Sequence, residues 1–228
     1  RNEGRVRALK ALRAERSQRL EQQGRAQVQV SNAKESGRKV IEAKDVSHSY
    51  DEQSLLNKFN LRVMRGDRIG LVGNNGVGKT TLLKILLGEL QPDQGSVQLG
   101  TQLTVGYFDQ VRQTLNHDQT VAWNVAEGRD HVTVDGVDRH IVGYLKNFLF
   151  TPQRARTPVH KLSGGECNRL MLAKLFARPT NLLVLDEPTN DLDIEMLEVL
   201  EQKLVEFTGT LILVSHDRAF MDNVVTST

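Results

Sequence analysis

The nine residues Gly73–Thr81, GNNGVGKTT, constrain the fold more than any other stretch of this sequence. They match the pattern G-x-x-x-x-G-K-[ST] and lie between an apolar run at 67–73 and an apolar-periodic segment at 79–90. A loop of this kind turns several backbone N–H groups toward one anion, while its Lys and Thr supply a cation and a metal-binding hydroxyl. The sequence therefore predicts a strand, a loop that binds a nucleoside triphosphate, and a helix in succession. A glycine-rich turn without a ligand is the weaker interpretation, because both flanking elements are of the required type.

Every residue of this loop is a candidate for phosphate binding. The candidates are Gly73, Asn74, Asn75, Gly76, Val77, Gly78, Lys79, Thr80 and Thr81. Among them, Lys79 is placed to reach the β- and γ-phosphates, and the Thr80 hydroxyl is placed to bind Mg²⁺.

Strands and helices alternate along the body of the chain, which begins near Lys39. The sequence predicts strands at 39–50, 55–64, 67–73, 96–100, 103–109, 181–186 and 210–215. It predicts helices at 79–90, over 119–150 apart from a hairpin at 131–140 turned by Asp135-Gly136, at 167–177 and at 193–207. Because the last two strands are apolar throughout, we expect an α/β fold with a parallel sheet covered on both faces. The expected core residues are Trp123 and Phe148, together with Leu197, Leu200 and Leu204 on one helical face.

Two acidic residues close the apolar strand at 181–186. Asp186 is its last residue, and Glu187 follows directly. The carboxyl ends of parallel strands form the ligand-binding edge of an α/β sheet, so both side chains are expected near the phosphate loop. Since adjacent residues of an extended chain point in different directions, we assign Asp186 to the metal ion and Glu187 to the attacking water as general base. In isolation, this pair would be interpreted as a helix cap or a solvated turn.

One histidine shares that edge. His216 follows the strand at 210–215, and we expect it to hydrogen-bond a γ-phosphate. The other five histidines, at 48, 117, 131, 140 and 160, are interpreted as surface or core residues.

A second candidate anion site lies at Leu162–Glu166, LSGGE. Ser163 and Glu166 form the S-x-x-E pattern of a capping box, which needs no ligand. That pattern leaves two glycines in the first helical turn unexplained, since each costs up to about 1 kcal/mol relative to alanine. The exposed N–H groups of Ser163, Gly164 and Gly165 at a helix N-terminus would bind an anion. Because one small domain has no evident way to bring two cradles onto one nucleotide, we expect this cradle to serve a nucleotide held by another domain.

The N-terminal residues 1–38 differ in charge from the rest of the chain. Residues 1–39 hold eleven Lys and Arg and four Glu, a net charge of +7, whereas the remainder carries −5. We expect an exposed helix at 2–23, a short strand at 26–30 and a loop at 31–37. A basic arm of this kind favours a polyanionic partner, and a solvated helix is the plain alternative.

Other features limit the class of protein. No apolar run approaches the 18 or so residues of a membrane span, and the chain begins at Arg1 without a signal-peptide pattern. We therefore expect a cytoplasmic fragment of a longer chain. The single cysteine, Cys167, excludes an internal disulfide. Its place in a first helical turn would lower the thiol pKa, so a redox role is an alternative to simple packing.

Over about residues 39–228, these motifs resemble an ATP-binding-cassette (ABC) ATPase. Gly73–Thr81 corresponds to the Walker A motif, Leu162–Glu166 to the signature motif, and Leu182–Asp186 to the Walker B motif with Glu187 catalytic. NDLD at 190–193 resembles the D-loop and His216 the switch histidine. The resemblance further implies that Gln110 contacts Mg²⁺ and senses the γ-phosphate, and that Tyr50 stacks on adenine. It implies a P-loop NTPase core with a mostly parallel sheet, an antiparallel β subdomain and a helical signature subdomain at about 111–178.

The motifs LDEPTNDLD and SHDR, with the basic arm, are most similar to the second cassette of the Uup branch of the ABC-F proteins. This resemblance implies that 1–38 is part of an inter-cassette linker and that 39–228 is an ABC ATPase domain truncated at its C-terminal end. The implied partners are a first ABC domain of the same chain, or a second copy of this fragment, and a ribosome or structured DNA or RNA. Cys167 departs from the Arg or Gln usual after LSGGE, which implies one polar contact fewer between cassettes.

The sequence thus predicts Mg²⁺-dependent ATP hydrolysis that closes and opens two cassettes on a ribosome or nucleic-acid target. The isolated fragment is expected to bind ATP and to hydrolyse it weakly unless it dimerises. Two alternatives stay open. The first is the ATPase subunit of a membrane transporter with a separate transmembrane partner. The second is a ribosome- or DNA-binding module in which ATP acts only as an ordering switch.

Overall fold

The structure is a computed structural model that describes residues 36–50, 53–72, 78–134 and 136–226. Its strands are β1 (Lys39–Tyr50), β2 (Gln53–Met64), β3 (Arg68–Leu71), β4 (Gln94–Leu99), β5 (Val105–Tyr107), β6 (His131–Val134), β7 (Val137–His140), β8 (Leu182–Asp186) and β9 (Thr210–Val214). Its helices are α2 (Lys79–Leu86), α3 (Phe108–Gln113), α4 (Val121–Ala126), α5 (Ile141–Lys146), α6 (Pro152–Ala155), the 3₁₀ helix η1 (Val159–Lys161), α7 (Gly164–Phe176), α8 (Ile194–Glu206) and α9 (Arg218–Val224). The elements predicted within 1–35 lie outside the described residues.

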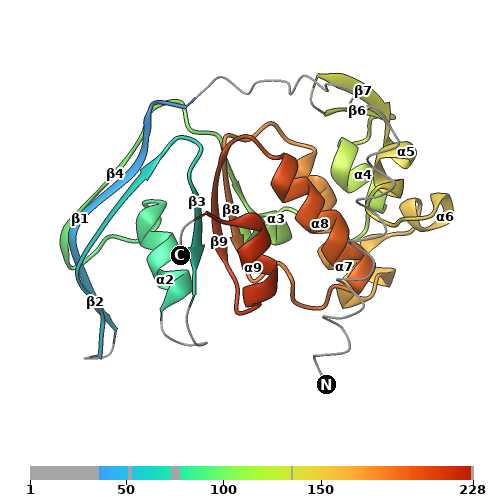
Figure 1. Ribbon diagram of the computed structural model, residues 1–228. Coiled ribbons are helices and arrows are strands. Elements are labelled where there is room, and N and C mark those ends of the chain that lie inside the picture. The colour runs from blue at the N-terminus through green and yellow to red at the C-terminus, as the bar shows by residue number, and fades with distance from the viewer. Residues whose placement is uncertain (1–35, 51–52, 73–77, 135, 227–228) are drawn as a thin grey trace.

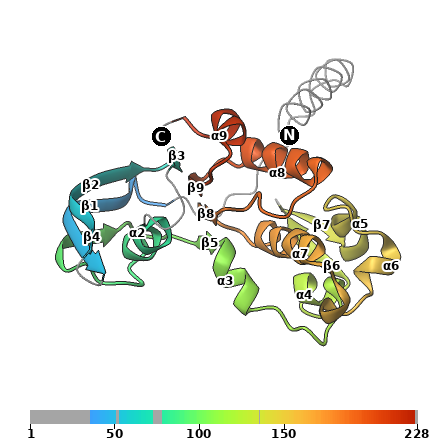
Figure 2. The same ribbon diagram turned by 90° about the horizontal axis from the view of Figure 1, so that it is seen from below.

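A parallel sheet of order β3-β9-β8-β5 forms the centre of the molecule (Figure 1). All three of its strand pairings are parallel. Helix α2 lies on one side of this sheet, and α3, α7, α8 and α9 lie on the other (Figure 2). The predicted parallel sheet with helices on both faces is therefore confirmed.

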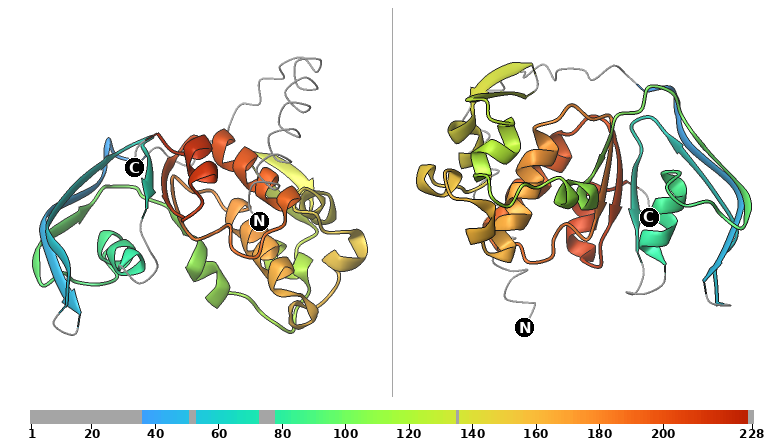
Figure 3. Two further views of the ribbon diagram at one scale, coloured as in Figure 1. Left: turned by 60° about the horizontal axis from the view of Figure 1, so that its bottom comes forward. Right: turned by 180° about the vertical axis from the view of Figure 1, so that it is seen from behind.

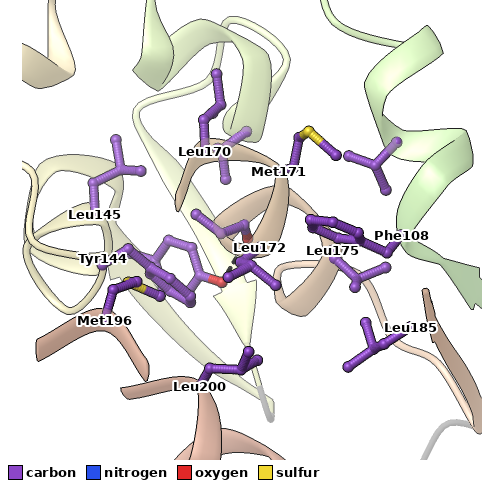
Figure 4. Close-up of a cluster of buried hydrophobic side chains, with 14 of the residues drawn as sticks. Phe108, Tyr144, Leu145, Leu170, Met171, Leu172, Leu175, Leu185, Met196 and Leu200 are labelled. Carbon is purple, nitrogen blue, oxygen red and sulfur yellow. Dashed lines mark hydrogen bonds between the residues drawn. The ribbon is translucent and has the colours of Figure 1, made fainter. Parts of the chain in front are cut away.

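The two faces of the sheet belong to two separate hydrophobic cores. Along β8, Leu183 and Leu185 enter the core shared with α7 and α8, whereas Leu182 and Val184 enter the core shared with α2. Figure 4 shows Leu185 beside side chains of α7 and α8 in the first of these cores. Successive residues of a strand point to opposite faces, so a strand buried on both faces is apolar at every position.

The start of β8 is held by the buried side chain of Asn181. Its amide accepts a hydrogen bond from Thr104 N at Oδ1 (2.8 Å) and donates one from Nδ2 to Gln102 O (2.8 Å). Its carbonyl accepts from Thr210 N at 2.9 Å. Asn181 therefore fixes the start of β8 to the segment that precedes β5 on one side and to the first residue of β9 on the other.

Two antiparallel units flank the central sheet (Figure 3). One is the sheet β2-β1-β4, in which β1 is central and antiparallel to both neighbours. The other is the β6–β7 hairpin, whose pairing confirms the hairpin predicted at 131–140. Gly136 follows β6 with φ +73°, a conformation that favours glycine, while Asp135 lies outside the described residues. The expected antiparallel β subdomain is confirmed by the β2-β1-β4 sheet.

Two predicted elements end earlier than expected. The helix predicted at 79–90 ends at Leu86, and Gly88 then adopts φ +76°, which a continuing α-helix does not allow. The strand predicted at 103–109 ends at Tyr107 because Phe108 begins α3 and is itself buried. In both segments apolar residues continue past the end of the helix or strand, so the hydrophobic pattern predicted an element longer than the one that forms.

The expected core residues are confirmed in part. Phe148 is fully buried, whereas Trp123 is 39% exposed, so its assignment to the core was wrong. Helix α4 fills its inner face with Val121, Val125 and Ala126, which leaves Trp123 on the outer side. In α8 the buried residue of the first turn is Met196 and not Leu197, and it shares its face with Leu200 and Leu204.

No helix among the described residues combines the length and the apolar character that a membrane crossing requires.

Candidate functional site

Polar side chains from three elements meet where the parallel strands end. Asp186 is the last residue of β8, and His216 lies two positions after the end of β9. Lys79 and Thr80 form the first turn of α2. The carboxyl ends of parallel strands share one edge of the sheet, so the separate motifs of the sequence become neighbours there.

Thr80 and Asp186 are in direct contact. The Thr80 hydroxyl donates a hydrogen bond to Asp186 Oδ2 at 2.7 Å. Burial raises the pKa of the Asp186 carboxyl above its ordinary value, so the site as it stands disfavours the charged form. A hydroxyl and a carboxylate oxygen side by side are the hard ligands that Mg²⁺ prefers. The residues therefore fit a divalent cation, which would also satisfy the half-buried Asp186 carboxylate.

Glu187 points away from that pair toward two other partners. Lys79 Nζ lies 3.2 Å from Oε1, and His216 Nδ1 lies 2.8 Å from Oε2. The Glu187 side chain is 17% exposed and its backbone is left-handed, with φ +47°. Its N–H donates to Val214 O at 2.9 Å. The structure thus brings Lys79, Glu187 and His216 together, with one partner on each carboxylate oxygen.

The N-terminus of α2 is not capped by a side chain. Gly78 occupies the N-cap with φ +85° and without a side-chain hydrogen bond. The preceding candidates Gly73, Asn74, Asn75, Gly76 and Val77 lie outside the described residues, and Thr81 is half-buried in the first turn.

The remaining candidates of this site lie around its rim. Tyr50 ends β1 with 67% of its surface exposed, as an aromatic ring available for stacking must be. Gln110, in α3, donates its side-chain amide to the Glu89 carboxylate, so the structure directs it to Glu89 and not to Asp186. Sequence reasoning missed Tyr107, whose buried phenol has its pKa raised to about 12 by burial and next by the charge of Asp186.

The signature segment begins α7 with a complete capping box, as predicted. Glu166 N donates to Ser163 Oγ at 3.2 Å, and Ser163 N donates to Glu166 Oε2 at 2.9 Å. Arg154, which sequence reasoning missed, donates to both Glu166 oxygens at 2.8 and 2.5 Å. These Arg154 hydrogen bonds lower the pKa of Glu166 to about 2. The Glu166 carboxylate therefore faces its own chain, whereas Ser163 and Gly164 are exposed.

The two glycines of LSGGE have different surroundings. A Cβ on Gly165 would lie 3.0 Å from Asp191 O, so the close approach of the chain to itself favours glycine there. A Cβ on Gly164 would meet no atom of the described residues within 4 Å. Packing within the described part of the chain thus explains Gly165 and leaves Gly164 without an internal reason.

The two helix N-termini lie on opposite sides of the parallel sheet. Figure 2 shows α2 on one side and α7 on the other, and Figure 1 agrees. This placement matches the expectation that the two cradles do not meet on one nucleotide. Beside the second cradle, burial and then Glu166 raise the pKa of the Cys167 thiol, which favours simple packing over the redox alternative. Desolvation of the half-buried sulfur is the largest of these effects.

A family model described as ABC transporter matches residues 56–190, which is more than half of the chain. The chain belongs to the ABC family. The match covers the Walker A stretch, the signature segment and the Walker B strand, so the ABC ATPase fold predicted from these motifs is confirmed.

Relatives of this ABC chain confirm the resemblance to the Uup branch. ATP-binding protein Uup of Escherichia coli K12 is 57% identical over 226 residues, which are 99% of this chain and 36% of that protein. The energy-dependent translational throttle protein EttA of Haemophilus influenzae is 40% identical over 190 residues, 83% of this chain and 34% of that protein. The chain thus spans about a third of the length of both curated relatives.

A solved structure shows the same fold. It is an ATP-binding cassette described as dimeric, in a post-hydrolysis state and bound to ADP and Pi. Its TM-score is 0.63 at 20% identity, and the match covers 82% of this chain and 93% of that one.

Proposed function

We propose that this ABC domain binds ATP with Mg²⁺ at the edge formed by α2, β8 and β9, and hydrolyses it when a second cassette closes over the site. The observation that carries the proposal is the Glu187 carboxylate, held between Lys79 and His216 beside the Thr80–Asp186 pair. A carboxylate held beside a metal-binding pair lies within reach of a water that attacks a metal-bound phosphate, which is the first requirement of a general base.

The residues divide the work as follows. Thr80 and Asp186 would hold Mg²⁺, and Gln110, released from Glu89, would join them. When bound, the metal neutralises charge on the phosphates. Lys79 leaves Glu187 to contact the β- and γ-phosphates. Glu187 then accepts a proton from the attacking water, while His216 keeps its carboxylate oriented and steadies the γ-phosphate.

The second half of the site is supplied by another cassette. The Ser163–Gly165 cradle lies across the sheet from α2, so it suits a nucleotide held elsewhere. The open space at Gly164 supports close approach from outside the chain. The dimeric state of the related cassette supports the same arrangement. The partner is a first ABC domain of a longer protein or, for this chain alone, a second copy.

The assembly acts in the cytoplasm on a ribosome or on structured nucleic acid, opening when the γ-phosphate is lost. Two observations support this target: the net charge of +7 over residues 1–39, and the similarity to a relative whose name refers to translation. A membrane transporter subunit would instead co-fractionate with membranes, and finding the native protein there would contradict the proposal.

The Glu187→Gln variant tests the chemistry. It keeps the hydrogen-bonding shape but removes the base, so we expect ATP binding within about threefold of the unaltered protein and turnover lowered about 10²- to 10⁴-fold. ATP binding and phosphate release are measured on the two-cassette protein. In cells the variant should lock onto its target, and sequencing the nucleic acid recovered with it identifies that target. Unchanged cellular function would favour the ATP-switched binding module.

A further inference from the structure

The loop that joins β8 to α8 begins at Glu187 and ends at Asp193. Asn190 N donates to Glu187 O at 3.3 Å, which closes its first turn. Asp193 accepts from Met196 N at 2.9 Å and so caps α8. Between them, Asp191 adopts a left-handed φ of +60°. The loop is therefore fixed at both ends, and its first residue is the proposed base.

One side of α7 contacts this loop at three places. Asn168 Nδ2 donates to Asn190 O at 2.9 Å, and the Asn168 side chain is buried, with 7% of the residue exposed. Gly165 lies against Asp191 O, and Arg169 forms an ion pair with Asp193. Positions 165, 168 and 169 share one helical face by their spacing. Of the three contacts, only that of Asn168 is a buried side chain hydrogen-bonded to the loop backbone.

Helix α7 is held firmly on its other sides. Leu170, Met171, Leu172 and Leu175 are buried in the core shown in Figure 4. Lys174 Nζ donates to Thr114 O at 3.0 Å, next to the end of α3. A helix packed in this way moves as a body, so a displacement of its N-terminus reaches Asn168 one turn later.

We propose that Asn168 is a positioning residue that couples the signature end of α7 to Glu187. The inference rests on the proposed two-cassette ATPase. In that assembly Ser163–Gly165 contacts the partner's nucleotide, while Glu187 serves this domain's own nucleotide. The Asn168 amide links the Ser163–Gly165 surface to Glu187 through the backbone of 187–190. Each nucleotide site is built from two cassettes, so this link transmits the state of the partner's site to the proposed base of this domain's own site.

The test uses the two-cassette protein with the base of the other cassette removed, so that turnover reports on Glu187 alone. Asn168→Asp keeps the side-chain size but sets a carboxylate against the Asn190 carbonyl. We expect kcat to fall about tenfold to a hundredfold, with KM for ATP within about twofold, because a small misplacement of a base lowers the rate without removing substrate contacts. Asn168→Gln, which keeps the amide donor, should retain most of the kcat that Asn168→Asp loses.

The matched control is Asn124→Asp. Asn124 is 1% exposed, and its Nδ2 donates to Asn116 O at 2.9 Å and Thr120 O at 3.0 Å, in a part of the fold that does not include the 187–193 loop. We expect this control to lower the unfolding temperature while leaving kcat nearly unchanged. Amide hydrogen exchange should be faster at 188–192 in Asn168→Asp and unchanged there in Asn124→Asp.

The outcomes are separable. If the unaltered protein turns over ATP and Asn168→Asp keeps its kcat, or loses no more than Asn124→Asp, the inference is wrong and the proposed function stands. If the unaltered protein shows no turnover, the proposed function fails first and the coupling fails with it.

Discussion

The N-termini of α2 and α7 are both candidate phosphate cradles, yet the chain treats them in opposite ways. Helix α2 starts from a left-handed glycine without a side-chain cap, whereas α7 starts from a complete capping box reinforced by Arg154. At α2, Lys79 pairs with Glu187 and Thr80 hydrogen-bonds Asp186 at the edge of the sheet. At α7, the only acid of the first turn, Glu166, is turned back onto its own chain.

This difference shows that the N-terminus of α2 needs a ligand to complete its hydrogen bonds, whereas the N-terminus of α7 is already capped by its own chain. The uncapped start of α2 leaves backbone N–H groups for phosphate oxygens and depends on the ligand to satisfy them. The capped start of α7 needs no ligand for its own stability. Substitutions at α2 should therefore affect binding and chemistry more than the stability of the fold, while substitutions at α7 should affect both.

The largest expected effect is at α2. Lys79→Met should lower ATP turnover of the two-cassette protein about 10²- to 10³-fold, because it removes a donor to the transferred phosphoryl group. Without ATP, the free energy of unfolding should fall by no more than about 3 kcal/mol, because the variant breaks the part-buried Lys79–Glu187 pair while His216 still pairs with Glu187. Turnover assays and urea unfolding measure the two effects. Lys84→Met, at an exposed position of the same helix, should leave both unchanged.

At α7 two neighbouring substitutions should separate stability from activity. Ser163→Ala removes the cap and should lower the free energy of unfolding by about 1 kcal/mol. Gly164→Ala should raise it by a few tenths of a kcal/mol, roughly, since its Cβ meets no described atom and alanine favours the helix. Both should lower turnover of the two-cassette protein, because both alter the surface offered to the partner's nucleotide. Full turnover in a stabilised Gly164→Ala protein would show that nothing approaches this surface.

The smallest expected effect is the pH dependence of the Arg154–Glu166 pair. The pKa of Glu166 falls from 4.5 to about 2 on folding, so the pair stabilises the fold above pH 4.5 and loses that contribution as the pH falls toward 2. Because the pair is partly exposed, Glu166→Gln should cost only about 0.2–1 kcal/mol at pH 7. Urea unfolding from pH 7 to pH 3 should show this difference shrinking. The loss caused by Ser163→Ala should depend less on pH, since the Ser163 side chain is a smaller cause of the lowered Glu166 pKa than Arg154.

Much of the fold follows from local pattern. Continuously apolar strands at 181–186 and 210–215 predicted a buried parallel sheet, and Asp135-Gly136 predicted the hairpin. The S-x-x-E pattern predicted the capping box at Ser163. The site residues could also be gathered, because strand ends, glycine loops and acids are marked along the sequence and parallel strands bring their ends to one edge.

Side-chain contacts between segments far apart in the sequence could not be predicted from it. Nothing near Arg154 indicates that it pairs with Glu166, and nothing near Asn168 indicates the Asn190 carbonyl. Trp123 was misplaced because hydrophobicity alone does not tell which side of a short helix faces inward. For Cys167 the sequence left a redox role open beside simple packing, because the burial that raises its pKa depends on contacts around α7 that no local rule contains.

Strand β8 is apolar on both faces, so its side chains do not distinguish one alignment with its neighbours from the next. A slip of a single residue would keep every leucine and valine buried, but it would put the Glu187 side chain in the place of Asp186. The proposed general base would then stand at the proposed Mg²⁺ position. The side-chain amide of Asn181, about 16 Å away at the start of β8, thus helps to set the alignment on which the proposed chemistry depends.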